Sequence, residues 1–439
     1  MLAAFFLLVT VLLTACTPSA SHVRPASGAA ASASTEQASR LVGLHQRFQV
    51  PAISTREFTH AQLWGALGPV VDRAANMQRD TVGRSAEGRP LYLVRYGQGP
   101  VRVLLWSQMH GNESTATLAL ADLLRFLAES PGDPLARRLA EKLTILAVPM
   151  LNPDGAERFQ RRNALGIDIN RDARALVTPE GRALKTLQER FRPAWGFNLH
   201  DQDVRSRVGG SDRLAAFALL APPFNPSRDD NAVRLRAKQL ASVIRQAAEP
   251  LVGGHITRYD DTFNPRAFGD LMQSWGVSTV LIESGGWRDD PEKQYLRRVN
   301  FVALLTALDA IATGAYAGAD LAWYEGLPPN GRQVNDLLVR GATMVSPGMA
   351  PYRADVAIDF RDSLGRRGGR VVDIGDLREY PARDTLDASG LFLHSGPDGP
   401  LMVDVSTSFV LRRGAAPGSA AVWTLDNGVP RPVPAGRTR

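Results

Sequence analysis

The chain has 439 residues, of which 44% are hydrophobic and 22% are charged, and its formal net charge is +7. A chain of this length is expected to form at least two domains, and its composition excludes both a disordered protein and a multi-pass membrane protein. The basic residues are spread along the chain and no Gly-x-x-x-x-Gly-Lys loop occurs, so we expect neither a nucleic-acid partner nor nucleotide chemistry.

The N-terminal segment has the pattern of an export signal. A mainly apolar run over Leu2–Leu13 is too short to span a bilayer comfortably and leads into Thr14, Ala15 and Cys16, the only cysteine. This ending is similar to a bacterial lipobox, whose cysteine is acylated. We therefore predict a signal peptide with lipobox over residues 1–16, and an exported, lipid-anchored protein of the bacterial cell envelope. Because no Lys or Arg precedes Cys16, a simply cleaved signal or a terminal helix with an incidental cysteine stays open.

The segment over residues 17–40 is rich in Ala and Ser and contains almost no large apolar side chain. Such a segment cannot bury enough surface to fold, so we predict a flexible tether. The tether would connect the lipid anchor to the first folded domain.

Residues 41–315 have the pattern of an α/β domain in which helices cover a sheet. Short apolar runs alternate with amphipathic stretches, and the runs are followed at once by polar residues. Buried strands are predicted over Val101–Trp106, Leu143–Val148, Trp195–Leu199 and Val277–Ile282. Helices are predicted over Ser114–Ala128, Pro179–Phe191, Asn231–Ala248 and Pro291–Thr313, and two of them begin with a proline that suits the first turn.

The pattern changes after Gly314. Pro328 and Pro329 interrupt the chain, and short β-type runs separated by Gly, Pro and Asp follow to the C-terminus. We predict a second, all-β domain over residues 316–439, with the character of a small β-sandwich. It contains no clustered set of metal ligands in its sequence, so its expected role is structural or substrate-presenting.

The first chemical motif follows the strand predicted at Val101–Trp106. His110 and Glu113 stand in a turn in which Gly111 permits a sharp bend, so both side chains can reach one Zn²⁺. Seen alone, a His-x-x-Glu pair is common on protein surfaces.

His200 is a candidate third ligand at the end of the strand predicted at Trp195–Leu199. Catalytic zinc commonly takes three protein ligands and keeps a fourth position for water. Open α/β sheets place their sites at the carboxyl ends of the strands, which favours a shared location with His110 and Glu113. A histidine that ends a strand can also be an ordinary edge residue.

Glu283 follows the fourth predicted strand directly, and Gly285 and Gly286 then free the chain from the sheet edge. A carboxylate beside a zinc-bound water can accept its proton and pass it to a leaving amine, as general acid–base catalysis requires. In isolation Glu283 would be better explained as a solvated loop residue.

Two arginines and an amide follow the strand predicted at Leu143–Val148. The run Asn152-Pro153-Asp154-Gly155 comes first, then Arg161, and then Asn170 and Arg171. Arginine binds a carboxylate through two parallel hydrogen bonds and can stabilise an oxyanion, so this group suits a substrate with a free C-terminal carboxylate. The alternative is a solvated basic loop.

Taken together, these motifs resemble the carboxypeptidase A-like zinc metallocarboxypeptidases. The family's order is kept over residues 85–287: His-x-x-Glu, Asn-Pro-Asp-Gly, an arginine, an Asn-Arg pair, a strand-ending histidine and a distal glutamate. The segment Glu87-Gly88-Arg89-Pro90-Leu91 before the first strand is also family-like. The resemblance implies a mixed central sheet with covering helices, one Zn²⁺ per chain and hydrolysis of C-terminal peptide bonds.

The resemblance also implies individual roles. The implied zinc ligands are His110, Glu113 and His200. Glu283 would be the general base and acid, and Arg161 would polarise the scissile carbonyl. Asn170 and Arg171 would bind the terminal carboxylate of the substrate.

One family feature is matched only approximately. The family has a mobile tyrosine before the catalytic glutamate, and Tyr259 is the only phenol available in that region. Tyr259 is therefore assigned to substrate binding by position alone. The nearby Asp270 lies in the region of the family's specificity pocket, and we expect it to cap a helix instead.

Three other functions stay open. An envelope location is compatible with an amidase or endopeptidase that acts on cell-wall peptides at the same site. A non-catalytic surface binding lipoprotein would usually have lost a zinc ligand or the general base, and all four residues are present. A deacylase of small N-acylated amino acids would share the zinc core, but Arg161, the pair Asn170–Arg171 and the expected export favour a peptide substrate.

Overall fold

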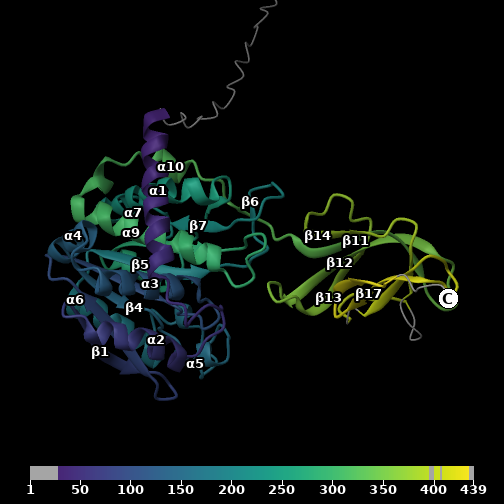
Figure 1. The fold of residues 1–439 in the computed structure, drawn as a ribbon, viewed down its shortest axis with the longest axis horizontal. Coiled ribbons are helices and arrows are strands. Elements are labelled where there is room, and N and C mark those ends of the chain that lie inside the picture. The colour runs from purple at the N-terminus through teal and green to yellow at the C-terminus, as the bar shows by residue number, and fades with distance from the viewer. Residues whose placement is uncertain (1–27, 395–399, 406–407, 435–439) are drawn as a thin grey trace, which may run out of the picture.

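The computed structural model describes residues 28–394, 400–405 and 408–434, which form an α/β domain followed by a β domain (Figure 1). The fold class predicted from the sequence, a mixed central sheet with covering helices plus a C-terminal all-β domain, is confirmed. The predicted signal peptide, including Cys16, lies outside the described residues. Within those residues, no helix combines the length and apolar character needed to cross a membrane.

The α/β domain is built on an eight-stranded mixed sheet with the order β1-β2-β4-β3-β5-β9-β7-β8. Its four central strands, β4, β3, β5 and β9, are parallel, whereas β1, β2 and β7 pair with antiparallel neighbours. The strands are β1 Met77–Arg84, β2 Pro90–Tyr96, β3 Val101–Ser107, β4 Leu143–Val148, β5 Trp195–Asp201, β7 Phe217–Leu220, β8 Ile256–Arg258 and β9 Ser278–Ser284.

Helices cover both faces of this sheet, which explains why the central strands are almost continuously apolar. On one face Val103 and Leu105 join a core with six longer helices and with single residues of two short ones; on the other, Leu104 and Trp106 pack with two helices. The first set is α1 Gly28–Phe48, α2 His60–Arg73, α3 Thr115–Glu129, α4 Pro134–Lys142, α7 Ala232–Val252 and α9 Gln294–Thr313. The second set is α6 Pro179–Phe191 and α8 Phe268–Ser274, and a short helix α5 covers Pro153–Glu157.

The predicted strands and helices of this domain match the structure to within a few residues. α6 begins and ends as predicted, because Thr178 accepts a hydrogen bond from the Gly181 backbone N–H and Pro179 occupies the first turn. α9 begins at Gln294 rather than at Pro291, since the backbone of Lys293 has a left-handed φ of 52° that separates it from the preceding turn.

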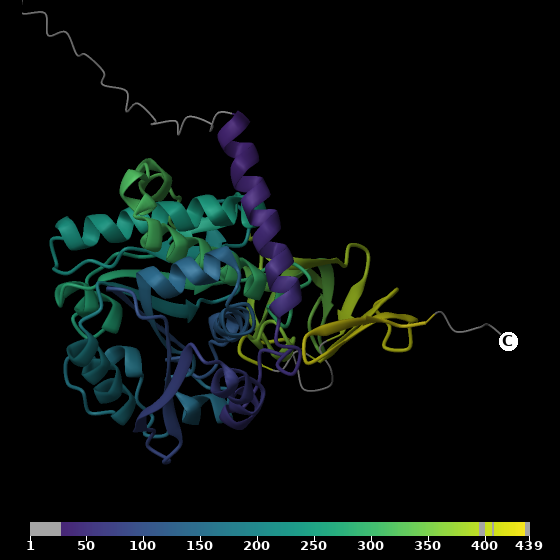
Figure 2. The same ribbon diagram turned by 60° about the vertical axis from the view of Figure 1, so that its left-hand side comes forward.

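The tether predicted over residues 17–40 is wrong from Gly28 onward, because α1 starts there. Alanine is the strongest helix former, and a helix needs only one apolar stripe to pack on a folded domain. The buried residues Ala38, Leu41, His45 and Phe48 provide this stripe, and α1 runs along one side of the α/β domain (Figure 2). The low apolar content of this segment therefore led to a wrong prediction, because the spacing of its few apolar residues is sufficient for a packed helix.

A short helical segment joins the two domains. Helix α10 (Ala322–Glu325) still packs on the α/β domain, because the Tyr324 hydroxyl accepts a hydrogen bond from the Ala221 backbone N–H and Lys238 pairs with Glu325 at 3.2 Å. Two short strands, β6 (Arg207–Val208) and β10 (Asn330–Gly331), then pair with each other. The change of domain therefore falls after Glu325 rather than at residue 316.

Where the structure describes it, the C-terminal domain has β strands as its only regular elements. They follow one hydrogen-bonded order, β13-β12-β11-β15-β16-β17-β18, with β14 paired to β11. Strands far apart in this order share one apolar cluster that includes Val371, Leu411 and Leu425, so the sheet curves over its own core. The strands are β11 Asn335–Val345, β12 Tyr352–Asp362, β13 Arg367–Gly375, β14 Ala382–Asp387, β15 Phe392–His394, β16 Phe409–Arg412, β17 Ala421–Asp426 and β18 Val429–Pro432.

Candidate metal and catalytic site

The site begins with the ends of two neighbouring parallel strands, β5 and β9. His200 of β5 lies directly opposite Glu283 of β9 in the strand register. Successive residues of a strand point to opposite faces, and Leu199 and Ile282 belong to the core on the α3 side. His200 and Glu283 therefore share the other face, at the carboxyl edge of the sheet.

His110 reaches the same edge through a tight turn that follows β3. Gly111 in this turn packs so closely on Gly155 that a Cβ atom at Gly111 would lie 2.0 Å from the Gly155 carbonyl carbon. Asn152 supports the turn, since its amide Nδ2 donates to the Met109 carbonyl at 3.2 Å. The Asn-Pro-Asp-Gly motif thus fixes the backbone that carries His110, and Gly111 is required because nothing larger fits.

His110, Glu113 and His200 converge on one point. Their ligand atoms all lie within 4.8 Å of one another, and all three side chains are buried. The Nδ1 atoms of His110 and His200 are each 2.7 Å from a different oxygen of Glu113. Two imidazole nitrogens and a carboxylate are the donor set that zinc takes in catalytic sites, so these residues fit a single zinc ion.

Asp168 is a residue of this site to which the sequence analysis assigned no role. Its carboxylate accepts a hydrogen bond from Nε2 of His110 at 2.9 Å and another from Nε of Arg161 at 3.0 Å. With the proton of a neutral imidazole held on Nε2, Nδ1 is left free to bind a metal. The usable signal was the position of Asp168 just before the Asn170–Arg171 pair.

The Glu283 carboxylate faces the same space and is 6% exposed. It makes no hydrogen bond or ion pair with any part of the chain that the structure describes. Burial raises the pKa of Glu283 well above its usual value, and the nearby charges of Glu113 and Asp201 add to the effect. A buried carboxyl without a protein partner is available to exchange protons with a bound molecule.

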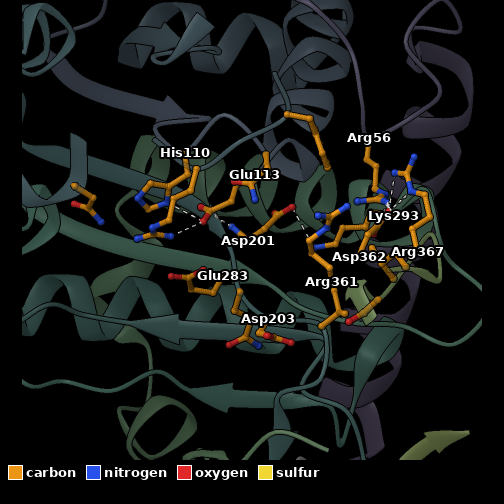
Figure 3. Close-up of a pocket in the computed structure, with 18 of the residues that line it drawn as sticks. Arg56, His110, Glu113, Asp201, Asp203, Glu283, Lys293, Arg361, Asp362 and Arg367 are labelled. Carbon is orange, nitrogen blue, oxygen red and sulfur yellow. Dashed lines mark hydrogen bonds and ion pairs between the residues drawn. The ribbon is translucent and has the colours of Figure 1, made fainter. Parts of the chain in front are cut away.

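A cleft of about 790 Å³ lies at this site and is lined by the residues that the sequence assigned to it, except His200 (Figure 3). Besides two of the metal-binding side chains and Glu283, the α/β domain contributes Arg161, Asn170, Arg171 and Tyr259. The sequence did not predict the rest of the wall, which includes Arg56 and Lys293 of the α/β domain and Arg361, Asp362 and Arg367 of the C-terminal domain.

The two residues expected to hold a carboxylate differ in how free they are. The Asn170 amide is engaged at both ends: Oδ1 accepts from the Phe268 backbone N–H at 2.9 Å, and Nδ2 lies 3.3 Å from Nε2 of His200. The Arg171 guanidinium makes one contact, to the Asn170 carbonyl at 2.7 Å. Arg171 is therefore the freer group for an anion, and Asn170 is suited to hold His200 and the adjacent helix in place.

The structure also shows the surroundings of Tyr259 and Asp270. Tyr259 lies in the cleft, where the negative charge of Glu283 and burial raise the pKa of its phenol. Asp270 is buried and accepts the Asn264 backbone N–H at 2.9 Å, so it caps the loop before α8. It does not cap the N-terminus of that helix, which lacks a side-chain cap.

The fold and site define an α/β protein with a buried three-residue metal centre at the carboxyl edge of its sheet. Residues 72–203 match the model of a known family, zinc carboxypeptidase. This part of the chain is thus similar to a zinc carboxypeptidase domain, and the resemblance inferred from the motifs is confirmed.

Relatives with curated names are similar to parts of this chain. Carboxypeptidase 2 of Trichophyton tonsurans is 34% identical over 143 residues, which cover 32% of this chain and 26% of that protein. Carboxypeptidase D of Mus musculus is 27% identical over 270 residues, 47% of this chain and 19% of that protein. The matched regions thus span about a quarter or less of these relatives.

Solved structures are also similar. A metallo-carboxypeptidase from Burkholderia cenocepacia has a TM-score of 0.47 at 20% sequence identity, and the match covers 59% of this chain and 70% of that one. A second similar structure, thrombin activatable fibrinolysis inhibitor, has a TM-score of 0.48 at 14% identity, covering 64% of this chain and 81% of that one.

Proposed function

We propose that this protein is a zinc-dependent metallocarboxypeptidase that removes the C-terminal residue of peptides. The observation that carries the proposal is a single cleft that combines a His-Glu-His metal centre, an unpartnered buried glutamate and the exposed side of Arg171. The zinc carboxypeptidase match over residues 72–203 supports the same reaction class.

His110, Glu113 and His200 would hold the zinc, which when bound acts as a Lewis acid and makes water a stronger acid. Glu283 then accepts a proton from the attacking water and delivers it to the leaving amine nitrogen. Its lack of other partners supports this double role, because no internal hydrogen bond has to break before the proton moves.

Arg161 and Arg171 position the substrate in this proposal. Arg161, whose side chain is 44% exposed, faces the cleft beside Glu113 and can donate to the carbonyl oxygen on which negative charge develops. Arg171 binds the terminal carboxylate, and Asn170 positions it. Tyr259 closes the cleft over the substrate.

We further propose that the protein is exported and held to the membrane through acylated Cys16. The lipobox-like ending Leu13-Thr14-Ala15-Cys16 supports this, since several acyl chains anchor a protein stably where one does not. The test compares membrane partition of parent and Cys16→Ser. An equally membrane-bound variant, or an unmodified mature N-terminus elsewhere, would remove the proposal.

The activity is tested by mass spectrometry of products from a mixed peptide library and from muropeptides. Removal of single C-terminal residues is the expected result. Cleavage confined to internal or cross-linking bonds of muropeptides would instead support the endopeptidase alternative. Substrates that stay intact with the zinc-loaded protein would contradict any peptidase function.

A further inference from the structure

The catalytic cleft has a wall that comes from the C-terminal domain. The turn between β12 and β13 enters the cleft, and Arg361, Asp362 and Arg367 line it together with Arg56 and Lys293 of the α/β domain. Figure 3 places these five residues on one side and His110, Glu113 and Glu283 on the other, with Asp201 between them.

Ion pairs hold this hairpin against the α/β domain. Arg56 binds both oxygens of Asp362, at 2.7 and 2.8 Å, and Arg367 pairs with Glu57 at 2.6 Å. At the base of the hairpin, Arg205 pairs with Asp359 at 2.6 Å. Paired guanidinium–carboxylate contacts fix direction as well as distance, so the hairpin is a docked part of the cleft.

Almost every charge at this end of the cleft is already neutralised by a neighbour. Lys293 pairs with Asp201 at 3.1 Å, and Asp203 pairs with Arg205 at 2.9 Å. Asp362 is shared by Arg56 and Arg367. Arg361 differs from these residues, because it is exposed and has no hydrogen bond or ion pair within the described part of the chain.

The position of Arg361 decides which part of a substrate it can meet. Asn170 lies 3.3 Å from His200 at the metal centre, and Arg171 contacts the Asn170 carbonyl. The hairpin lies on the other side of Asp201 from His110, Glu113 and Glu283 (Figure 3). With its terminal carboxylate at Arg171 and its scissile bond at the metal, a peptide places its preceding residues in the remainder of the cleft, of which the hairpin is a wall.

We propose that Arg361 binds a carboxylate of the substrate upstream of the scissile bond, so that the C-terminal domain selects acidic peptides. This inference rests on the proposed function for the direction of the peptide. A guanidinium without an internal partner loses little when it turns to a substrate carboxylate, and it gains a charge-assisted hydrogen bond.

The experiment uses pairs of fluorescent peptides with the same C-terminal residue and either Glu or Gln at one upstream position, moved stepwise along the peptide. Dissociation constants are measured by anisotropy on the full zinc-loaded chain with Glu283→Gln, which binds without turnover. Arg361→Gln and Arg361→Glu are compared with Arg370→Gln in the same background. Arg370 is a matched control, since it is also exposed, lies on the adjacent strand β13 and does not line the cleft.

At one position the Glu peptide should bind about fivefold more tightly than the Gln peptide, the upper range for an exposed ion pair. Arg361→Gln should abolish this preference, Arg361→Glu should reverse it, and Arg370→Gln should keep it. Equal binding of both peptides at every position, or a preference that survives in Arg361→Gln, overturns the proposal.

Cleavage by the parent chain separates this inference from the proposed function. Peptides that are trimmed without any Arg361-dependent preference leave the function standing and overturn the inference. Peptides that bind with the Arg361-dependent preference but are not trimmed support the inference and overturn the proposed function. If neither peptide of any pair binds, both are contradicted.

Discussion

The two regions that border the cleft hold their charges in different ways. At the sheet edge, the metal ligands and Glu283 are between 2% and 7% exposed. On the hairpin, the side chains of Asp362 and Arg367 are 20% and 61% exposed. A buried charge costs several kcal/mol unless it is compensated, whereas an exposed ion pair contributes at most about 1 kcal/mol. The sheet edge therefore suits catalysis, and the hairpin suits docking and substrate selection. Substitutions at the sheet edge should have larger effects than substitutions in the hairpin.

Loss of a metal ligand should produce the largest effect. His200→Ala leaves two protein ligands, so zinc content should fall from about one per chain to a small fraction, and peptide hydrolysis should disappear with it. Elemental analysis after dialysis measures the metal directly. The control is His394→Ala in the β domain, whose ring lies at hydrogen-bond distance from the Gly414 carbonyl and outside the metal centre. A His200→Ala chain that binds zinc as tightly as the parent would show that the ligand assignment is wrong.

Replacing the proposed general base, Glu283, should have the next largest effect on activity. Glu283→Gln preserves size but cannot accept a proton, so kcat/KM should fall by about 10²- to 10⁴-fold, toward the upper end if both proton transfers use Glu283. Zinc content and thermal stability should stay near the parent values. Glu141→Gln, at an exposed position on α4, is the matched control. A loss below about tenfold with full zinc occupancy would contradict the mechanism.

The same difference between regions explains what the sequence could predict. His200 and Glu283 follow strongly apolar strands, and the carboxyl ends of parallel strands meet at one edge, so their proximity could be inferred without coordinates. The His-x-x-Glu turn was predictable for the same reason, because β3 is the neighbour of β5. These are local sequence patterns, and the pairing of the parallel strands brings the residues that carry them together in one site.

The hairpin could not be predicted in this way. The contact of Arg56 with Asp362 joins residues 306 positions apart, and neither residue stands in a recognisable motif. Asp168 stands two residues before Asn170, yet its contact with His110 depends on how a loop folds back. Helix α1 was missed because composition was weighed above spacing. Each failure concerns tertiary contacts that no local pattern encodes.

Asp270 is a buried carboxyl of the α/β domain that makes no ion pair with the described residues, so its pKa should reflect the cost of burial. Burial raises the pKa of Asp270 to about 6 from an ordinary value of 3.8. The native state therefore holds a proton that the unfolded state has lost, and stability falls as pH rises from about 4 to 6. Asp270→Asn removes this penalty and should be more stable than the parent at pH 7 by about 3 kcal/mol.

Urea unfolding at a series of pH values tests this expectation. The difference between Asp270→Asn and the parent should vanish below about pH 4, where Asp270 is protonated in both states. A variant that is less stable than the parent at pH 7 would mean that the ionised carboxylate, through its bond to the Asn264 N–H, stabilises the native state.

The docked hairpin should give the smallest effect and the opposite dependence on pH. Burial works to raise the pKa of Asp362, but the Gly365 N–H, Arg367 and Arg56 outweigh it and hold the pKa below its usual value. A depressed pKa stabilises the native state above the unfolded value near 3.8, and this contribution is lost as pH falls through the native pKa. Asp362→Asn should therefore weaken domain docking by about 1 kcal/mol at neutral pH, and the difference from the parent should shrink both in acid and at high salt. Limited proteolysis of the segment between α10 and β11 measures this docking. The control is Glu379→Gln, which changes an exposed carboxylate elsewhere on the same domain. The Asn variant should be cut faster than the parent with unchanged zinc content, because the metal centre does not depend on the hairpin. Equal cutting rates at neutral pH and low salt would mean that apolar contacts, and not the Arg56–Asp362 pair, hold the hairpin in the cleft.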